Sequence, residues 1–211
     1  MKNKIQNKNE LDSFICHQWN EINTYLNNLK KDLPIPFYSS VDIRESRNKY
    51  APVDHNMYPA GFNNVCAIDL KAAVPIIQKT ILKINPQTKL VGIIPESNTK
   101  NTFYLDHLHA LTQLLKSAGF SVAIISFDHT LFEEGKKILK LLSYSSHEIE
   151  FHLAELLDDP KGNKNSKIIS FNNTIVDTIV MNHDQSNPLP VDWNIIQTPI
   201  SPSPKIGWFI R

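Results

Sequence analysis

The residues of this sequence best suited to chemistry are gathered between positions 36 and 64, PFYSSVDIRESRNKYAPVDHNMYPAGFNN. Carboxylates, guanidinium groups and amides alternate there with aromatic rings, at Asp42, Arg44, Arg47, Asp54, His55, Asn56, Asn63 and Asn64 among Phe37, Tyr38, Tyr50, Tyr58 and Phe62. An arginine fork matches a carboxylate and an aspartate can hold an ammonium, so the mixture suits a small zwitterionic ligand. The alternative is a surface loop whose Asp and Asn residues only form turns.

The same segment is interrupted by Pro36, Pro52, Pro59 and Gly61 and shows no helical or strand periodicity. A long irregular segment inside a compact domain is usually either functional or disordered. The aromatic side chains argue against disorder, because a solvated tail does not carry so much apolar surface. We therefore expect an ordered loop that presents its polar groups to a ligand.

Composition limits the class of protein. The chain has 211 residues, of which 41% are hydrophobic, and a formal charge of +1, so one domain or slightly more is expected and no nucleic-acid partner. Cys16 and Cys66 form no metal-binding spacing and indicate reduced thiols in the cytoplasm. No apolar run approaches the ~18 residues of a membrane span, and no glycine-rich phosphate-binding loop is present.

The hydrophobic pattern predicts an α/β domain. Strands at 89–95 and 121–127 flank a helix at 103–118, which defines a strand–helix–strand unit with parallel strands and places Leu111 and Ile124 in the core. Other segments are predicted as an amphipathic helix packed on the domain at 11–33, helices at 69–83 and 131–142, and strands at 149–153, 167–171 and 177–181. His107 and His109 are two positions apart on one helix, so they face different sides and cannot share a metal ion.

Two further polar stretches follow predicted buried strands. In an open parallel sheet, ligands bind beyond the carboxyl ends of the strands. We therefore add candidates from both stretches to those of segment 36–64: Glu96, Asn98, Thr99 and Asn101, then Asn182 and Asp184. The alternative for the first stretch is a helix N-cap, in which Asn98 or Thr99 bonds backbone amides, and for the second an exposed turn.

Four segments together resemble a known family: FYSSVDIR with KYAPVDHNMYPAGFNN, IPESNTKNTFYLDHL, IVMNHDQS, and a final GW..R. The sequence is similar to the proteobacterial glutamate–cysteine ligases related to the ATP-grasp enzymes, and the likeness covers nearly the whole chain. The resemblance implies a Rossmann-like fold of the pre-ATP-grasp type. The sequence departs from the family pattern at Arg47, His55 and His183.

The resemblance also implies a reaction: ATP-dependent joining of glutamate and cysteine into γ-glutamylcysteine, with Mg²⁺ as the second cofactor. We divide the chain into an N-terminal amphipathic helix at 1–35, a substrate domain at 36–186 and a proline-rich linker at 187–211, which by the resemblance leads toward an absent ATP-grasp half. Within these regions the resemblance implies that Asp42, Arg44 and Asp54 bind substrate and that Arg211 contacts the nucleotide. We expect the chain alone to be inactive. The alternatives are a non-catalytic module that binds amino acids or peptides, and a remnant without a ligand.

Overall fold

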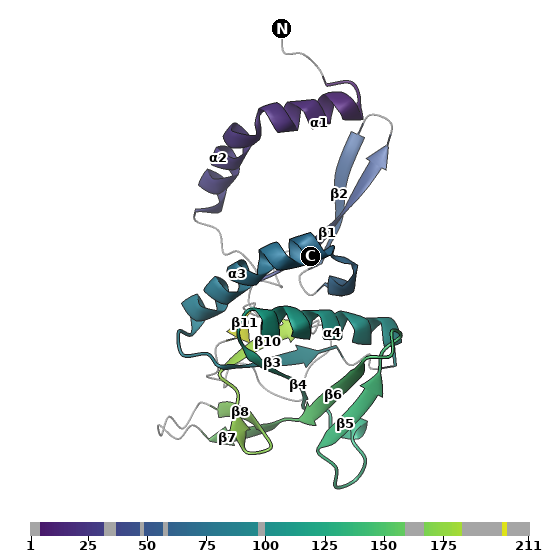
Figure 1. Ribbon diagram of the computed structural model, residues 1–211, viewed down its shortest axis with the longest axis vertical. Coiled ribbons are helices and arrows are strands. Elements are labelled where there is room, and N and C mark those ends of the chain that lie inside the picture. Colours follow the sequence, from purple (N-terminus) through teal and green to yellow (C-terminus); the bar gives the residue numbers. More distant parts are fainter. Residues whose placement is uncertain are drawn as a thin grey trace.

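The computed structural model describes residues 5–31, 37–46, 49–56, 59–96, 100–158, 167–182 and 200–201, and its centre is a six-stranded sheet (Figure 1). The strand order is β11-β10-β3-β4-β6-β5, in which every neighbouring pair is parallel except β5 with β6. The bounds are β3 Leu90–Pro95, β4 Ser121–Ser126, β5 Ile138–Leu142, β6 Glu148–Leu153, β10 Thr178–Asn182 and β11 Ile200–Ser201. The protein is therefore mixed α/β with a mostly parallel sheet, as the hydrophobic pattern predicted.

The predicted strand–helix–strand unit is confirmed as β3, α4 (Thr102–Ser117) and β4. Helix α4 begins where the Asn101 side chain accepts hydrogen bonds from the amides of Phe103 and Tyr104, which caps the first turn. It ends before Gly119, whose φ of +94° favours a residue without a Cβ atom. Local sequence signals therefore set both ends of helix α4.

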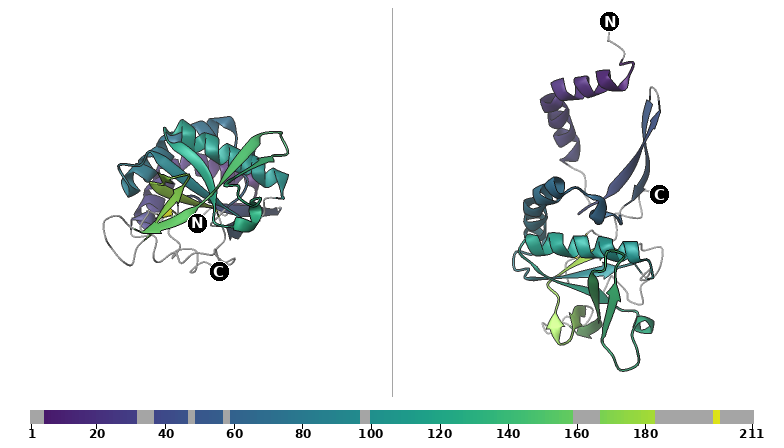
Figure 2. Two further views of the ribbon diagram at one scale, coloured as in Figure 1. Left: turned by 90° about the horizontal axis from the view of Figure 1, so that it is seen from below. Right: turned by 45° about the vertical axis from the view of Figure 1, so that its right-hand side comes forward.

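The sheet is the middle of three layers (Figure 2). Helices α3 (Ala67–Ile84) and α4 cover one face, against Val91, Ile93 and Phe151 of the strands. The other face packs on a small antiparallel sheet of β7 Glu155–Asp158, β8 Lys167–Phe171 and β9 Thr174–Ile175. Because side chains alternate along a strand, Ile94 faces the small antiparallel sheet while its neighbour Ile93 faces the helices.

Gly92, in β3, has no room for a side chain between its neighbours in the central sheet and Val176. A Cβ atom there would lie 2.9 Å from Ile125 Cδ1, 2.9 Å from Val176 Cγ1 and 3.0 Å from Ile179 Cδ1. We expect Gly92→Ala to lower the free energy of unfolding by about 1–3 kcal/mol, the usual cost of overpacking. Urea denaturation of Gly92→Ala and of Gly92→Ala/Ile125→Val tests whether the clash is the cause. The second change removes Cδ1 of Ile125, one of the clashing atoms. Equal stability of Gly92→Ala and wild type would contradict the prediction.

The N-terminal part differs from its prediction. The expected single helix is two helices, α1 Lys8–His17 and α2 Trp19–Lys30, and none of their residues is buried. Instead of packing on the domain, the apolar stripe is open to solvent, with Trp19 56% and Tyr25 64% exposed. In Figure 1 these helices stand off the sheet beyond α3. No helix among the described residues is long and apolar enough to span a membrane.

Segment 36–64 is not the irregular loop that its composition suggested. Much of it is a β-hairpin of β1 Ser40–Ser46 and β2 Lys49–Asn56, which pairs Arg44 with Ala51 and has an irregular register between Val41 and Asp42. The aromatic anchors Phe37, Tyr38 and Phe62 pack against the main core, which confirms that these parts are ordered. The hairpin itself is largely exposed, and its two strands pair with each other and not with the central sheet.

The predicted helix at 131–142 is wrong. The chain forms a short 3₁₀ turn at His129–Leu131, then a turn in which Gly135 has φ +76°, and then strand β5. Strand β5 pairs antiparallel with β6, and Lys140 bonds Glu148 across the pair at 2.7 Å. Pairing with a strand later in the chain overrides the helical propensity of its leucine and lysine residues.

Candidate functional site

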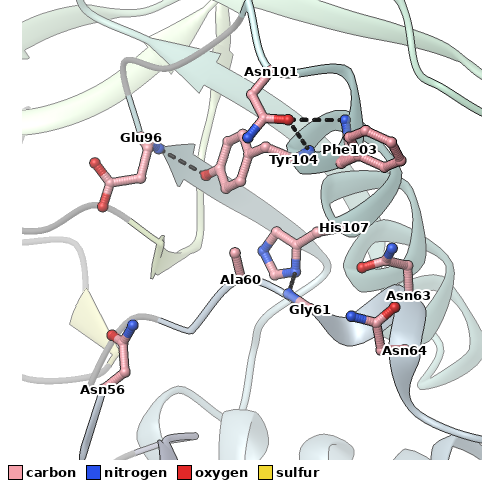
Figure 3. A pocket seen from close by; sticks show the side chains of 10 residues that line it. All are labelled: Asn56, Ala60, Gly61, Asn63, Asn64, Glu96, Asn101, Phe103, Tyr104 and His107. Atoms are coloured by element: carbon pink, nitrogen blue, oxygen red, sulfur yellow. Dashed lines mark hydrogen bonds between the residues drawn. The ribbon is translucent and has the colours of Figure 1, made fainter. Parts of the chain in front are cut away.

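A pocket of ≈ 460 Å³ lies beyond the carboxyl end of β3. Four parts of the chain form it: the last residue of β2, residues 60–64 after the hairpin, the residue after β3, and the N-cap and first turns of α4 (Figure 3). Its lining residues are Asn56, Ala60, Gly61, Asn63, Asn64, Glu96, Asn101, Phe103, Tyr104 and His107. The place is the one that the parallel topology favours, since β3 and β10 end side by side with Pro95 opposite Asn182.

One wall of the pocket comes from the end of β3 and the start of α4. The Glu96 amide donates a hydrogen bond to the Tyr104 hydroxyl at 2.8 Å, which ties the residue after the strand to the helix. Tyr104 is buried, and burial raises the pKa of its hydroxyl well above the ordinary value, so it stays protonated. Glu96 is half-buried and brings the only carboxylate among the lining residues of this pocket.

The opposite wall is a tight turn that carries Asn63 and Asn64. Residues Phe62–Asn64 form one turn of 3₁₀ helix after Gly61. The φ angle of Gly61 is +128°, a conformation that glycine adopts readily and residues with a Cβ atom rarely adopt. His107 Nδ1 accepts hydrogen bonds from the amides of Gly61 at 3.0 Å and Phe62 at 3.2 Å. The turn is therefore held by a side chain from α4, and its two asparagine amides are exposed at the pocket.

Asn182, at the end of β10, lies behind these walls and is fully buried. Its side-chain oxygen is 2.7 Å from the Tyr104 hydroxyl and 2.9 Å from His107 Nε2. Its side-chain nitrogen donates to the Tyr38 hydroxyl and to the Pro59 carbonyl, both at 3.1 Å. Burial lowers the pKa of His107 to about 4, opposed by its bond to Asn182, so the imidazole is neutral at physiological pH.

The structure brings together part of the set predicted from sequence. The residues that line the pocket are Asn56, Asn63, Asn64, Glu96 and Asn101. Asp42, Arg44 and Asp54 instead lie on exposed parts of the hairpin and do not line it. Asn182 is adjacent but has its polar atoms occupied by protein groups, so it can act on a ligand only through the residues it holds. Ligand binding by these residues stays a prediction.

Several predicted residues fall outside the described part of the chain. These are the ligand candidates Asn98, Thr99 and Asp184, the nucleotide candidate Arg211, and the departures from the family pattern Arg47 and His183. The linker predicted at 187–211 lies outside it too, apart from the short strand β11.

Sequence reasoning missed the aromatic and imidazole part of the site, formed by Phe103, Tyr104 and His107. All three lie in the helix predicted at 103–118, and the sequence pattern singles out His107 alone, as a residue that cannot share a metal ion with His109. The available signal was the family-like stretch IPESNTKNTFYLDHL, which contains them together with Glu96 and Asn101. Their function depends on which face of α4 meets the β10 end, and the helix alone does not determine that.

These features define a class: an α/β domain whose mostly parallel sheet ends in a pocket lined mainly by polar side chains. The family model of glutamate-cysteine ligase matches residues 12–211, so the chain belongs to the glutamate–cysteine ligase family. No curated protein matches the sequence. The family uses ATP and Mg²⁺.

A solved structure supports the same relationship. The crystal structure of a protein from Methylobacillus flagellatus KT, assigned as a γ-glutamylcysteine synthetase, is 29% identical to the chain with a TM-score of 0.76. The match covers 91% of this chain and 42% of that chain. The chain therefore spans less than half the length of this relative.

The described residues do not fit a Mg²⁺–ATP site. Within them no group of three or more His, Cys, Asp or Glu residues could hold a metal ion. The residues that line the pocket include no lysine or arginine to neutralise phosphate groups.

Proposed function

We propose that this chain provides the amino-acid-binding part of a glutamate–cysteine ligase. The reaction joins the γ-carboxylate of glutamate to the amine of cysteine in an ATP-dependent step and forms γ-glutamylcysteine. Family membership supports the reaction, and the pocket at the end of β3 supports the role of this part of the chain. The observation that carries the proposal is that one carboxylate and several amides converge on a pocket of this size.

The groups in the pocket match the two ends of a free amino acid. The Glu96 carboxylate can pair with an ammonium group, and such charge-assisted hydrogen bonds are stronger than neutral ones. The side-chain amides of Asn63, Asn64 and Asn101 can donate to a carboxylate. Ligation reactions depend on holding the reacting amine and carboxyl groups in place, which is the task that such a pocket performs.

The finer features of the fold and setting are also proposals. The strand–helix–strand unit and the parallel order of the sheet support a Rossmann-like, pre-ATP-grasp assignment with its substrate domain at 36–186. Cys16 and Cys66 are free and exposed, which supports a reducing, cytoplasmic setting. The direct substrate roles of Asp42, Arg44 and Asp54, and of Arg211 toward ATP, have the family resemblance alone as support.

We expect Glu96→Gln to weaken binding of glutamate by about 1–3 kcal/mol, the scale of a lost charge-assisted bond. Isothermal titration calorimetry of the full chain with glutamate, and separately with cysteine, measures the change. Glu134→Gln is the matched control, since Glu134 is exposed and does not line the pocket. Unchanged glutamate and cysteine affinity in Glu96→Gln would rule out the pairing.

The main alternative is a non-catalytic module that binds amino acids or peptides in the same pocket. The calorimetry distinguishes it by selectivity, because a ligase pocket should prefer glutamate or cysteine to alanine, leucine and short peptides. Equal affinity for these ligands would favour the alternative.

A further inference from the structure

The donor and the acceptor of each hydrogen bond behind the pocket can be assigned in one consistent way. His107 Nδ1 accepts from two backbone amides, Gly61 and Phe62, so the proton of the neutral ring must be on Nε2. Nε2 then donates to the Asn182 side-chain oxygen at 2.9 Å. The Tyr104 hydroxyl accepts from the Glu96 amide and donates to the same oxygen.

The other side of Asn182 is fully used as well. Its side-chain nitrogen donates to Tyr38 and to the Pro59 carbonyl, and the Tyr38 hydroxyl donates to the Met181 carbonyl at 2.6 Å. Each polar atom of this buried side chain therefore has a protein partner. A network in which every member is satisfied is rigid, and it specifies one arrangement of the groups it joins.

The network connects both walls of the pocket. On one side Tyr104 holds the backbone of Glu96, and on the other His107 holds the turn that carries Asn63 and Asn64 (Figure 3). Phe62 packs near the imidazole, with ring centroids 5.5 Å apart, which further locates the turn. The spacing between the carboxylate and the asparagine amides thus depends on Tyr104 and His107, whose polar side-chain atoms are bonded to protein groups.

We propose that His107 is a positioning residue of the pocket. It holds the Asn63–Asn64 turn against α4 through the Gly61 and Phe62 amides, and so sets the distance between this turn and Glu96, which Tyr104 of the same helix holds. The inference rests on the proposed function in one respect, that the ligand so positioned is an amino acid. His107 itself has its Nδ1 and Nε2 atoms occupied by the protein. Its ring nitrogens therefore influence the ligand through the turn and not by a direct hydrogen bond.

Two substitutions separate the hydrogen bonds of His107 Nδ1 with the turn from that of Nε2 with Asn182. In His107→Asn the side-chain oxygen can occupy the position of Nδ1 and accept from the turn, while the bond to Asn182 is lost. In His107→Gln the side-chain nitrogen can occupy the position of Nε2 and donate to Asn182, while Gly61 and Phe62 lose their acceptor. His109→Gln is the control, since His109 lies on the same helix and stacks on His147 outside the pocket.

The test measures amide hydrogen exchange of Gly61 and Phe62 and calorimetric affinity for glutamate in the full chain, with melting curves to match folded fractions. We expect His107→Gln to speed exchange at both amides and to weaken glutamate binding, each by about tenfold, as loss of one net hydrogen bond predicts. His107→Asn should stay close to wild type in both, and His109→Gln should match wild type.

Equal loss of affinity in His107→Asn and His107→Gln, or unchanged exchange in His107→Gln, would overturn the proposal. If wild type binds no glutamate while the exchange pattern holds, the proposed function fails but His107 still positions the turn. Should His107→Gln not fold, imidazole ¹⁵N shifts of wild type decide. An Nε2-protonated ring with a bare Nδ1 supports the inference, and an Nδ1-protonated ring refutes it.

Discussion

Replacing Leu111 with alanine is expected to lower the free energy of unfolding by about 2–5 kcal/mol. Leu111 lies in the middle of α4, is fully buried, and belongs to the core between the two helices and the sheet. Its removal leaves a cavity, because the surrounding side chains belong to two helices and several strands that cannot all move inward together. Urea denaturation followed by far-UV circular dichroism gives the change in free energy.

The control for this prediction is Leu142→Ala, on β5, where the leucine is 63% exposed. Removal of an exposed leucine creates no cavity, so we expect a change within about 0.5 kcal/mol. Equal denaturation midpoints for Leu111→Ala and wild type would show that α4 presents a different face to the sheet. The pocket would then also need revision, because Tyr104 and His107 are placed by the same helix.

Acidification is expected to destabilise the protein through His107 by about 3 kcal/mol between pH 6.5 and pH 4. The pKa of this imidazole falls from its ordinary 6.5 to about 4 in the folded state because the ring is buried. The unfolded chain therefore binds a proton in this pH window that the folded protein does not bind. The stability contributed by neutral His107 is complete above pH 6.5, is lost as the pH falls toward 4, and declines no further below that.

Other groups add to the acid response, so the measurement must be a difference. Burial also lowers the pKa of His109 and of His152, which gives the same sign. The comparison is between pH 7 and pH 4.5 in wild type and in His107→Gln, which has no titrating ring at this position. We expect a clearly shallower pH dependence in the variant, and identical slopes would contradict the assignment of a buried neutral His107.

Removing the Glu96 carboxylate is expected to have a smaller effect than the Leu111→Ala substitution, and one that is confined to ligand binding. Glu96 is half-buried at the mouth of the pocket, and its backbone already has a partner in Tyr104. The side chain can therefore change without loss of that bond. This separation of backbone and side-chain roles makes Glu96→Gln a test of function, whereas Leu111→Ala tests the fold.

Local patterns were sufficient for the central strands and for α4. Buried runs of β-branched residues at β3 and β4, with the Asn101 cap and Gly119 at the two ends of the helix, act through neighbours in sequence. Such signals do not depend on distant contacts. The adjacency of the β3 and β10 ends could be anticipated too, since parallel strands end at one edge of the sheet.

Patterns failed where a distant segment determines the structure. Strand β5 forms because it pairs with β6, which comes later in the chain. The apolar stripe of α1 and α2 predicts burial, but none of the residues of these two helices is buried. In the hairpin, Pro52 resembles a loop residue although it lies opposite Ile43 in the strand pair. Asp54, with φ +51°, is the extra residue at the irregularity of the register. Composition could not distinguish a paired hairpin from an ordered loop.

The sequence by itself determined the α/β class, the family-like segments and five of the residues that line the pocket, since these depend on residue type, spacing and strand ends. Only the tertiary structure decided that Arg44 lies away from these residues and that Asn182 is enclosed. It alone placed His107 against Gly61, 46 positions earlier in the chain, and against Asn182, 75 positions later. Hydrogen bonds over such separations form when the whole chain packs, because burial leaves each polar group with only the partners that the fold brings to it.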